Sequence, residues 1–107
     1  MSTDERRPSW TFLTNHTQVL LRISQKSDLR LRDVAQTVGI TERAVQRIVA
    51  DLAAAGIIER RRVGRRNQYL INRSAAMRHA AQAEHHVGPL LDLLRPKDER
   101  DTGGGTD

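Results

Sequence analysis

The chain has 107 residues, which suits one domain and is too short for two domains with separate cores. Its 18 Lys and Arg exceed its 13 Asp and Glu, so a polyanion is the expected class of partner. The chain has no cysteine, which excludes disulfides and thiolate metal sites. No apolar run approaches the ~20 residues that cross a bilayer and the N-terminus lacks a signal-peptide core, so we expect a cytoplasmic protein.

Both ends of the chain have the composition of tails. Residues 1–9 are polar and include a proline, and residues 96–107 combine alternating charges with three glycines. Such segments bury too little apolar area to offset the entropy of ordering them. We therefore expect a flexible tail over 1–9, a folded domain over 10–73, a C-terminal segment over 74–95 and a disordered tail over 96–107.

The first helix is expected to begin at Asn15, whose side chain can cap the helix while Gln18 follows three residues later. Val19, Leu20 and Ile23 continue it at helical spacing, and the pattern ends near Ser27. Residues 29–31 alternate apolar and charged side chains. They predict a short strand or an extended link.

Two further helices are separated by a tight turn. The second is expected over 32–38, where Gly39 ends it because glycine adopts the left-handed conformation freely. Thr41 is a good N-cap for the third helix, expected over 42–55, and Gly56 is suited to end that helix.

A hairpin and a helical segment complete the body. Residues 57–62 and 68–71 have strand character and flank a five-residue connection, VGRRN. Residues 74–94 are expected to be mostly helical, with an interruption at Gly88-Pro89. The expected fold is therefore mainly α with a small β-hairpin, in the order α-β-α-α-β-β-α.

The segment over 31–50 has the residue types that a helix-turn-helix requires. Two helices cross steeply over a short turn in that motif, and Ala35, Gly39 and Ala44 are small where the helices approach. The expected shared core consists of Val34, Val38, Ile40, Val45, Ile48 and Val49. At 100° per residue, Arg43 and Arg47 lie opposite this core, with Gln46 to one side.

These residues, followed by GIIER over 56–60 and VGRRNQY over 63–69, resemble winged helix-turn-helix transcriptional regulators of the MarR and ArsR type. The likeness covers residues 12–72. The hairpin of this chain departs from the usual MarR wing, which carries an aspartate beside its arginine. The metal-binding cysteine motif of ArsR sensors is absent from the sequence.

The resemblance implies that the third helix enters the major groove and that the hairpin, the wing, touches the backbone or the minor groove. The helix would then supply Thr41, Glu42, Arg43, Gln46 and Arg47. The wing would supply Arg62, Arg65, Arg66 and Asn67.

The charge pattern agrees with this independently, because residues 60–66 hold five arginines, and the planar guanidinium binds phosphate bidentately. The plainer alternatives are a solvated basic turn and an ordinary exposed helix face on which Arg47 pairs with Asp51.

The sequence thus predicts a sequence-specific regulator of transcription that binds duplex DNA and is nucleoid-associated when bound. A winged-helix module that binds RNA or a protein is the alternative, since the fold does not fix the ligand. No catalytic arrangement is visible, so we expect neither catalysis nor a cofactor. His79 and His86 would share a helix face near Glu84, but without a third defined ligand they are better interpreted as ordinary exposed or interface histidines than as a metal site.

Several apolar side chains still need a place to be buried. These are Trp10, Phe12 and a stripe of Val87, Leu90, Leu91 and Leu94. The stripe packs either on its own domain or against a second copy of the chain. We expect dimerisation through the stripe, because two-fold dimers are common and helix-turn-helix proteins usually bind paired half-sites.

Overall fold

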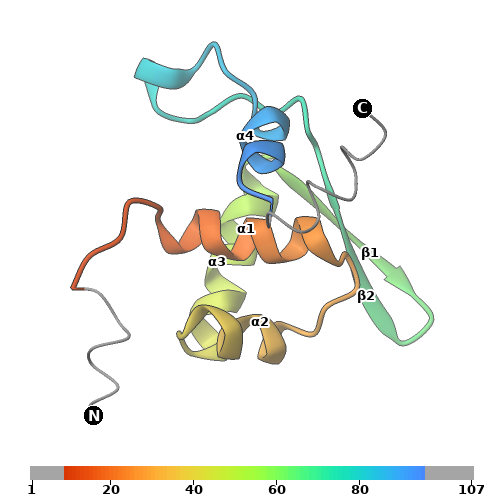
Figure 1. Cartoon of the computed structure of the whole chain (residues 1–107). Coiled ribbons are helices and arrows are strands. Elements are labelled where there is room, and N and C mark those ends of the chain that lie inside the picture. The colour runs from red at the N-terminus through yellow and green to blue at the C-terminus, as the bar shows by residue number, and fades with distance from the viewer. Residues whose placement is uncertain (1–8, 96–107) are drawn as a thin grey trace, which may run out of the picture.

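The computed structural model describes residues 9–95, so both expected tails, apart from Ser9, lie outside the described residues. The elements in chain order are α1 (Asn15–Gln25), α2 (Leu31–Val38), α3 (Glu42–Ala54), β1 (Ile58–Val63), β2 (Arg66–Ile71), the short 3-10 helix η2 (Ala80–Gln82) and α4 (Val87–Leu93). Figure 1 shows α1 crossing in front of α3, with α2 below, the hairpin to one side and α4 above. The mainly α fold with one hairpin is confirmed.

The strand expected over 29–31 is absent from the described residues. Leu31 is instead the first residue of α2. The link before it makes one backbone contact with the hairpin, since the Tyr69 N–H donates to the Ser27 carbonyl at 3.0 Å. A single bond does not make a ladder, so the sheet has two strands and the order is α-α-α-β-β-α.

Side-chain caps and glycines set the ends of the helices. Thr14, rather than Asn15, caps α1 by accepting from the Thr17 N–H, and α1 ends at Gln25, earlier than expected. The predictions for the turn between α2 and α3 are confirmed. Gly39 is left-handed with φ 89°, and the Thr41 hydroxyl accepts from the Ala44 N–H at 3.0 Å.

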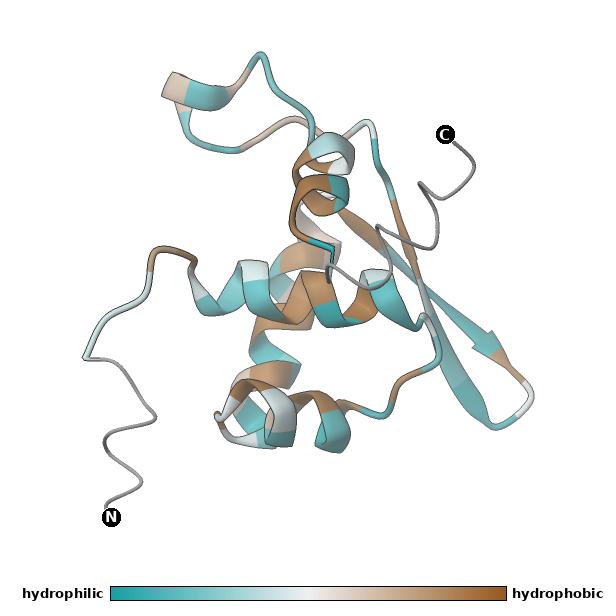
Figure 2. Cartoon of the chain, in the orientation of Figure 1, coloured by the Kyte–Doolittle hydropathy of each residue, from teal (hydrophilic) through white to brown (hydrophobic). Residues whose placement is uncertain are grey.

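The core lies where the three long helices face one another. Figure 2 shows apolar residues concentrated where the helices lie against one another, and hydrophilic residues along most of the hairpin. The helices α1 to α3 contribute the buried residues Val19, Leu20, Leu21, Ile23, Val34, Ala35, Val45, Ile48, Val49 and Leu52. The hairpin and its approach add Ile57, Ile58 and Tyr69, and α4 adds Val87 and Leu91.

The hairpin is tighter than the sequence pattern predicts. Val63 pairs with Arg66, so the connection is Gly64-Arg65 rather than five residues. Gly64 has φ 62° at the first central position, as a type II′ turn requires. Each strand is therefore longer than expected at the turn, and Arg62 and Asn67 belong to the ladder as a cross-strand pair.

The segment between β2 and α4 is less helical than expected. Only η2 and α4 are helical within 74–94, and Gly88-Pro89 lies in the first turn of α4. The rest folds back on itself, since the Met77 N–H donates to the His85 carbonyl and the Val87 N–H to the Ala75 carbonyl. Half-buried Ala75 and Met77 flank exposed Ala76, which is a period of two rather than the helical period.

No helix within residues 9–95 combines the length and the hydropathy that a membrane-spanning helix needs.

Candidate nucleic-acid interface

The α3 helix separates a buried face from a charged face. Val45, Ile48, Val49 and Leu52 are at most 5% exposed and pack into the core. The opposite face exposes Glu42, Arg43, Gln46, Arg47 and Ala50. Because its buried side chains fix the rotation of α3 about its axis, the exposed arginines and glutamine point outward together.

Arg47 does not pair with Asp51 as the plainer alternative required. The Asp51 carboxylate instead accepts from His16 Nε2, 2.8 Å away, which joins the first turn of α1 to α3. Among the described residues no ion pair involves Arg43 or Arg47. Within residues 9–95 both guanidinium groups are therefore unpaired, and both residues are exposed.

The hairpin carries a dense set of cations. Arg60 lies opposite Tyr69, with its guanidinium carbon 6.0 Å from the ring centroid. Arg62 donates from Nε to the Gly64 carbonyl at 3.2 Å, which folds its side chain toward the turn. Arg66 lies 3.7 Å from an Asp28 carboxylate oxygen, a loose contact between exposed side chains.

The structure adds a basic residue that sequence reasoning missed. Arg30, the exposed residue before α2, lines a shallow hollow of about 330 Å³ together with Arg65, Arg66 and Asn67. Arg30 is more than 30 positions from the other three residues in sequence, and it meets them because the link before α2 contacts the edge of β2 at Tyr69. Only the fold reveals that Arg30 extends the basic surface of the hairpin.

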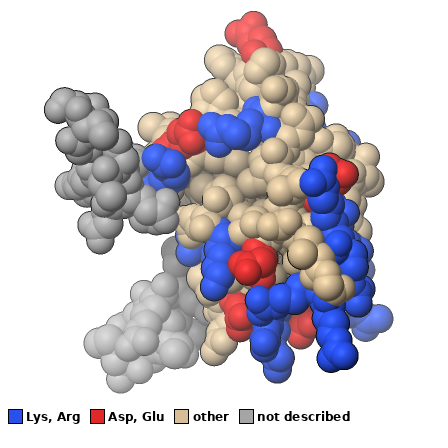
Figure 3. All heavy atoms as spheres, turned by 90° about the vertical axis from the view of Figure 1, so that its right-hand side faces the viewer, with Lys and Arg blue, Asp and Glu red and all other residues tan. Residues whose placement is uncertain are grey.

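The face that carries the hairpin is predominantly basic. Figure 3 shows Lys and Arg side chains gathered over its lower part, with a few acidic side chains between them. Such a surface attracts a polyanion at long range and neutralises phosphates at contact. The hairpin cations and the exposed face of α3 are consecutive along the chain, joined by the turn at Gly56.

Residues 13–59 match a protein family described as winged helix-turn-helix DNA-binding. The match covers α1 to α3 and the start of β1, and the hairpin follows at the place of a wing. The fold is a winged helix-turn-helix. DNA is the ligand class that this match supports. No curated protein and no solved structure matches the chain.

The stripe predicted to form a dimer is divided between two environments in the winged helix. Val87 and Leu91 are 5% and 1% exposed and belong to the core of their own domain. Leu90 and Leu94 are half-buried, whereas Leu93, outside the stripe, is 68% exposed. For Val87 and Leu91 the structure therefore matches the alternative in which the stripe packs on its own domain, and dimerisation through the stripe stays a prediction.

The histidines do not share a helix face. His79 precedes η2 and accepts the Ala81 N–H at Nδ1. His86 precedes α4, and its backbone forms an isolated antiparallel β-bridge with Ala76. Within the described part of the winged helix, no group of three or more His, Cys, Asp or Glu side chains is placed to hold a metal ion.

Proposed function

We propose that this winged helix is a sequence-specific regulator of transcription that binds duplex DNA with α3 in the major groove. The observation that carries the proposal is the exposed face of α3, where Arg43, Gln46 and Arg47 project opposite four buried side chains. Arginine can bond guanine O6 and N7, and glutamine can bond adenine N6 and N7. Thr41 and Glu42, at the start of α3, complete the proposed groove-facing set.

The wing has a different role in this proposal. Arg62, Arg65, Arg66 and Asn67 contact the phosphate backbone or the minor groove, with Arg30 beside them. Guanidinium groups bind phosphate through paired hydrogen bonds and stay charged at any physiological pH. Backbone contacts of this kind orient the protein and raise its affinity without reading sequence. The turn at Gly39 and the position of the hairpin directly after α3 support a regulator of the MarR and ArsR type, although the wing lacks the aspartate usual in MarR proteins.

Two copies of the chain bind together in this proposal. One α3 helix reads only a few base pairs, and helix-turn-helix proteins commonly double the site by pairing half-sites. A module for protein partners is less well supported, because such a surface would present an apolar patch where α3 presents charge. RNA shares the phosphate chemistry of DNA and is therefore the alternative that an experiment must separate.

The test is selection of bound sequences from a random duplex library at physiological salt. We expect enrichment of a motif with two related half-sites on the order of 10 base pairs apart. Structured RNA added as competitor should displace the selected duplex poorly. Binding without enrichment would show that the protein contacts only the DNA backbone and does not read sequence. Efficient displacement of the duplex by RNA would show that RNA is the preferred ligand.

A further inference from the structure

Two apolar features of the winged helix lack a partner within residues 9–95. The first is an aromatic pair before α1. Trp10 and Phe12 are 67% and 91% exposed, and their rings lie edge to face with centroids 5.0 Å apart. A mutually packed pair of large rings in water is unusual for a surface that contacts nothing, because each ring would bury on the order of 150 Å² or more if covered.

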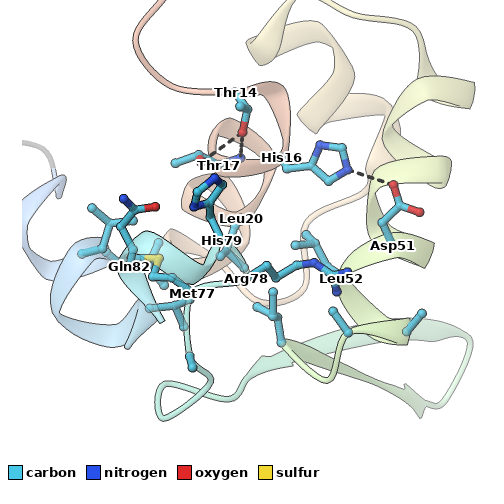
Figure 4. A pocket seen from close by; sticks show the side chains of 17 residues that line it. Thr14, His16, Thr17, Leu20, Asp51, Leu52, Met77, Arg78, His79 and Gln82 are labelled. Atoms are coloured by element: carbon cyan, nitrogen blue, oxygen red, sulfur yellow. Dashed lines mark hydrogen bonds and ion pairs between the residues drawn. The ribbon is translucent and has the colours of Figure 1, made fainter. Parts of the chain in front are cut away.

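The second feature is a pocket of about 800 Å³ bounded by α1, the end of α3 and the segment over 76–91. Its apolar lining includes Leu20, Leu52, Ile57, Leu90 and Leu91. Figure 4 shows polar groups around the pocket, with the bonded His16 and Asp51 on one side, His79 and Gln82 on the other, and the Arg78 side chain extending between them toward Leu52. The pocket therefore combines an apolar lining with polar side chains that can form hydrogen bonds.

The residues at the rim are suited to an aromatic occupant. Arg78 makes no ion pair with any described residue, so its guanidinium is available to stack on a ring face. The Met77 thioether, also in the lining, makes favourable contacts with ring edges. The His79 Nδ1 accepts the Ala81 N–H, which leaves the protonated Nε2 of the neutral ring as a donor.

The aromatic pair does not reach this pocket in its own chain. Leu13 packs against the core and Thr14 caps α1, so the two residues that precede the helix are anchored. Figure 1 shows the chain before α1 running away from α4 and from the segment over 76–86. Thr14 also lines the pocket, so the aromatic arm, residues 10–12, starts beside the rim but leads outward.

We propose that the aromatic arm of one copy fills this pocket in a second copy, and that the exchange is reciprocal about a two-fold axis. The inference rests on the dimer in the proposed function and names its interface. Half-buried Leu90 of the predicted stripe then forms part of the pocket wall that receives the partner's rings, together with Ala54 and Met77. An isologous exchange buries both unpartnered features at once.

Trp10 is the chain's single tryptophan, so its fluorescence reports on the arm directly. With DNA absent, we expect the emission of the wild-type chain to shift to shorter wavelength as concentration rises, in parallel with dimer formation by light scattering. Ala54 is exposed on α3 and lines the pocket, whereas Ala50, one turn earlier, does not. Ala54→Glu should raise the dissociation constant of the dimer at least about tenfold, while Ala50→Glu leaves it unchanged.

A mixing experiment tests exchange between chains. The Trp10→Ala variant emits no tryptophan signal but keeps its pocket, and Ala54→Glu keeps its arm. Adding the first to the second should shift the emission of the second to shorter wavelength. Phe12→Ala provides a second check, since it leaves Ala54 and the pocket intact and should weaken the dimer at least about tenfold.

Three results would overturn the inference. Emission typical of exposed tryptophan at every concentration would show that the arm stays in water. A shifted emission in a monomer would place the arm on its own chain, and a dimer with exposed Trp10 would place the interface elsewhere. Because DNA is absent throughout, each result is independent of whether α3 binds DNA.

Discussion

Arg60 and Tyr69 face each other across the hairpin, with the guanidinium carbon 6.0 Å from the centroid of a ring that is only 3% exposed. Tyr69 also donates its backbone N–H to the Ser27 carbonyl. One residue therefore connects the core, the link before α2 and the cations of the wing. The direction in which the wing projects is set from inside the domain.

Replacing Tyr69 with Ala should lower the free energy of unfolding by about 3–5 kcal/mol, because it leaves a cavity where a buried ring packs. Tyr69→Phe keeps the ring and should cost far less. Denaturant unfolding of both variants measures the difference. A loss below about 1 kcal/mol for Tyr69→Ala would mean that the ring is not part of a tight core.

The α4 helix offers a matched pair of leucines. Leu91 is 1% exposed and Leu93 is 68% exposed on the same short helix. Leu91→Asp should unfold much of the population, because an aspartate there loses the buried side chain and buries a charge. Leu93→Asp should stay within about 0.5 kcal/mol of wild type. Thermal unfolding followed by circular dichroism distinguishes them, and equal transition midpoints would contradict the placement of α4.

Much of the fold could be predicted because its signals are local. Gly39 and Thr41 mark the ends of adjacent helices through their own backbone and side-chain chemistry, and the period of apolar residues gives the buried face of α3. The exposed positions of Arg43 and Arg47 follow from that period alone. These inferences need no knowledge of the rest of the chain.

The remainder depends on contacts between distant segments. The pairing of His16 with Asp51 spans 35 positions, and the hollow that contains Arg30 forms only when the link before α2 contacts β2. The segment over 74–86 is rich in good helix formers, yet Met77 and His85 bond across a loop instead. Intrinsic helix propensity predicts secondary structure poorly where the backbone groups of a segment form hydrogen bonds with another segment.

Thr41 has a structural role beside its proposed position in the groove. Its hydroxyl accepts the Ala44 N–H at 3.0 Å, so Thr41→Ala should destabilise the protein by about 1 kcal/mol. Thr41→Ser retains the oxygen and should lose little. Thr37→Ala, on the exposed face of α2, is the control and should change stability by less than about 0.5 kcal/mol. Equal losses of stability at both threonines, measured by chemical denaturation, would show that the Thr41 hydroxyl does not stabilise α3 as an N-cap.

Arg65 in the turn of the wing should act through charge alone. Arg65→Ala should weaken binding to all duplexes similarly and reduce the log–log slope of affinity against salt by about 0.9 for one lost phosphate contact. Arg95→Ala, beyond α4, removes the same charge away from the wing and should leave the slope nearly unchanged. Titrations at several salt concentrations provide the measurement. Identical slopes for both variants would show that Arg65 of the wing does not contact the phosphate backbone of the DNA.

Arg47 should read sequence. Arg47→Ala should cost about 1–3 kcal/mol on the selected duplex and much less on a scrambled one. Its side chain lies opposite the core, so thermal unfolding should match wild type. Equal losses on the two duplexes would assign Arg47 to the phosphate backbone, and no loss on either would remove it from the interface.

The arginines of β1 have a consequence for solubility as well. In the described chain β1 pairs with β2 alone, so its other edge is left without a neighbouring strand. Exposed strand edges invite addition of strands from other molecules, and closely spaced positive charges oppose that addition. Binding-deficient variants that place Thr or Val at Arg60, Arg61 and Arg62 would create a bare, β-prone edge, whereas glutamate at the same positions would keep the molecules apart.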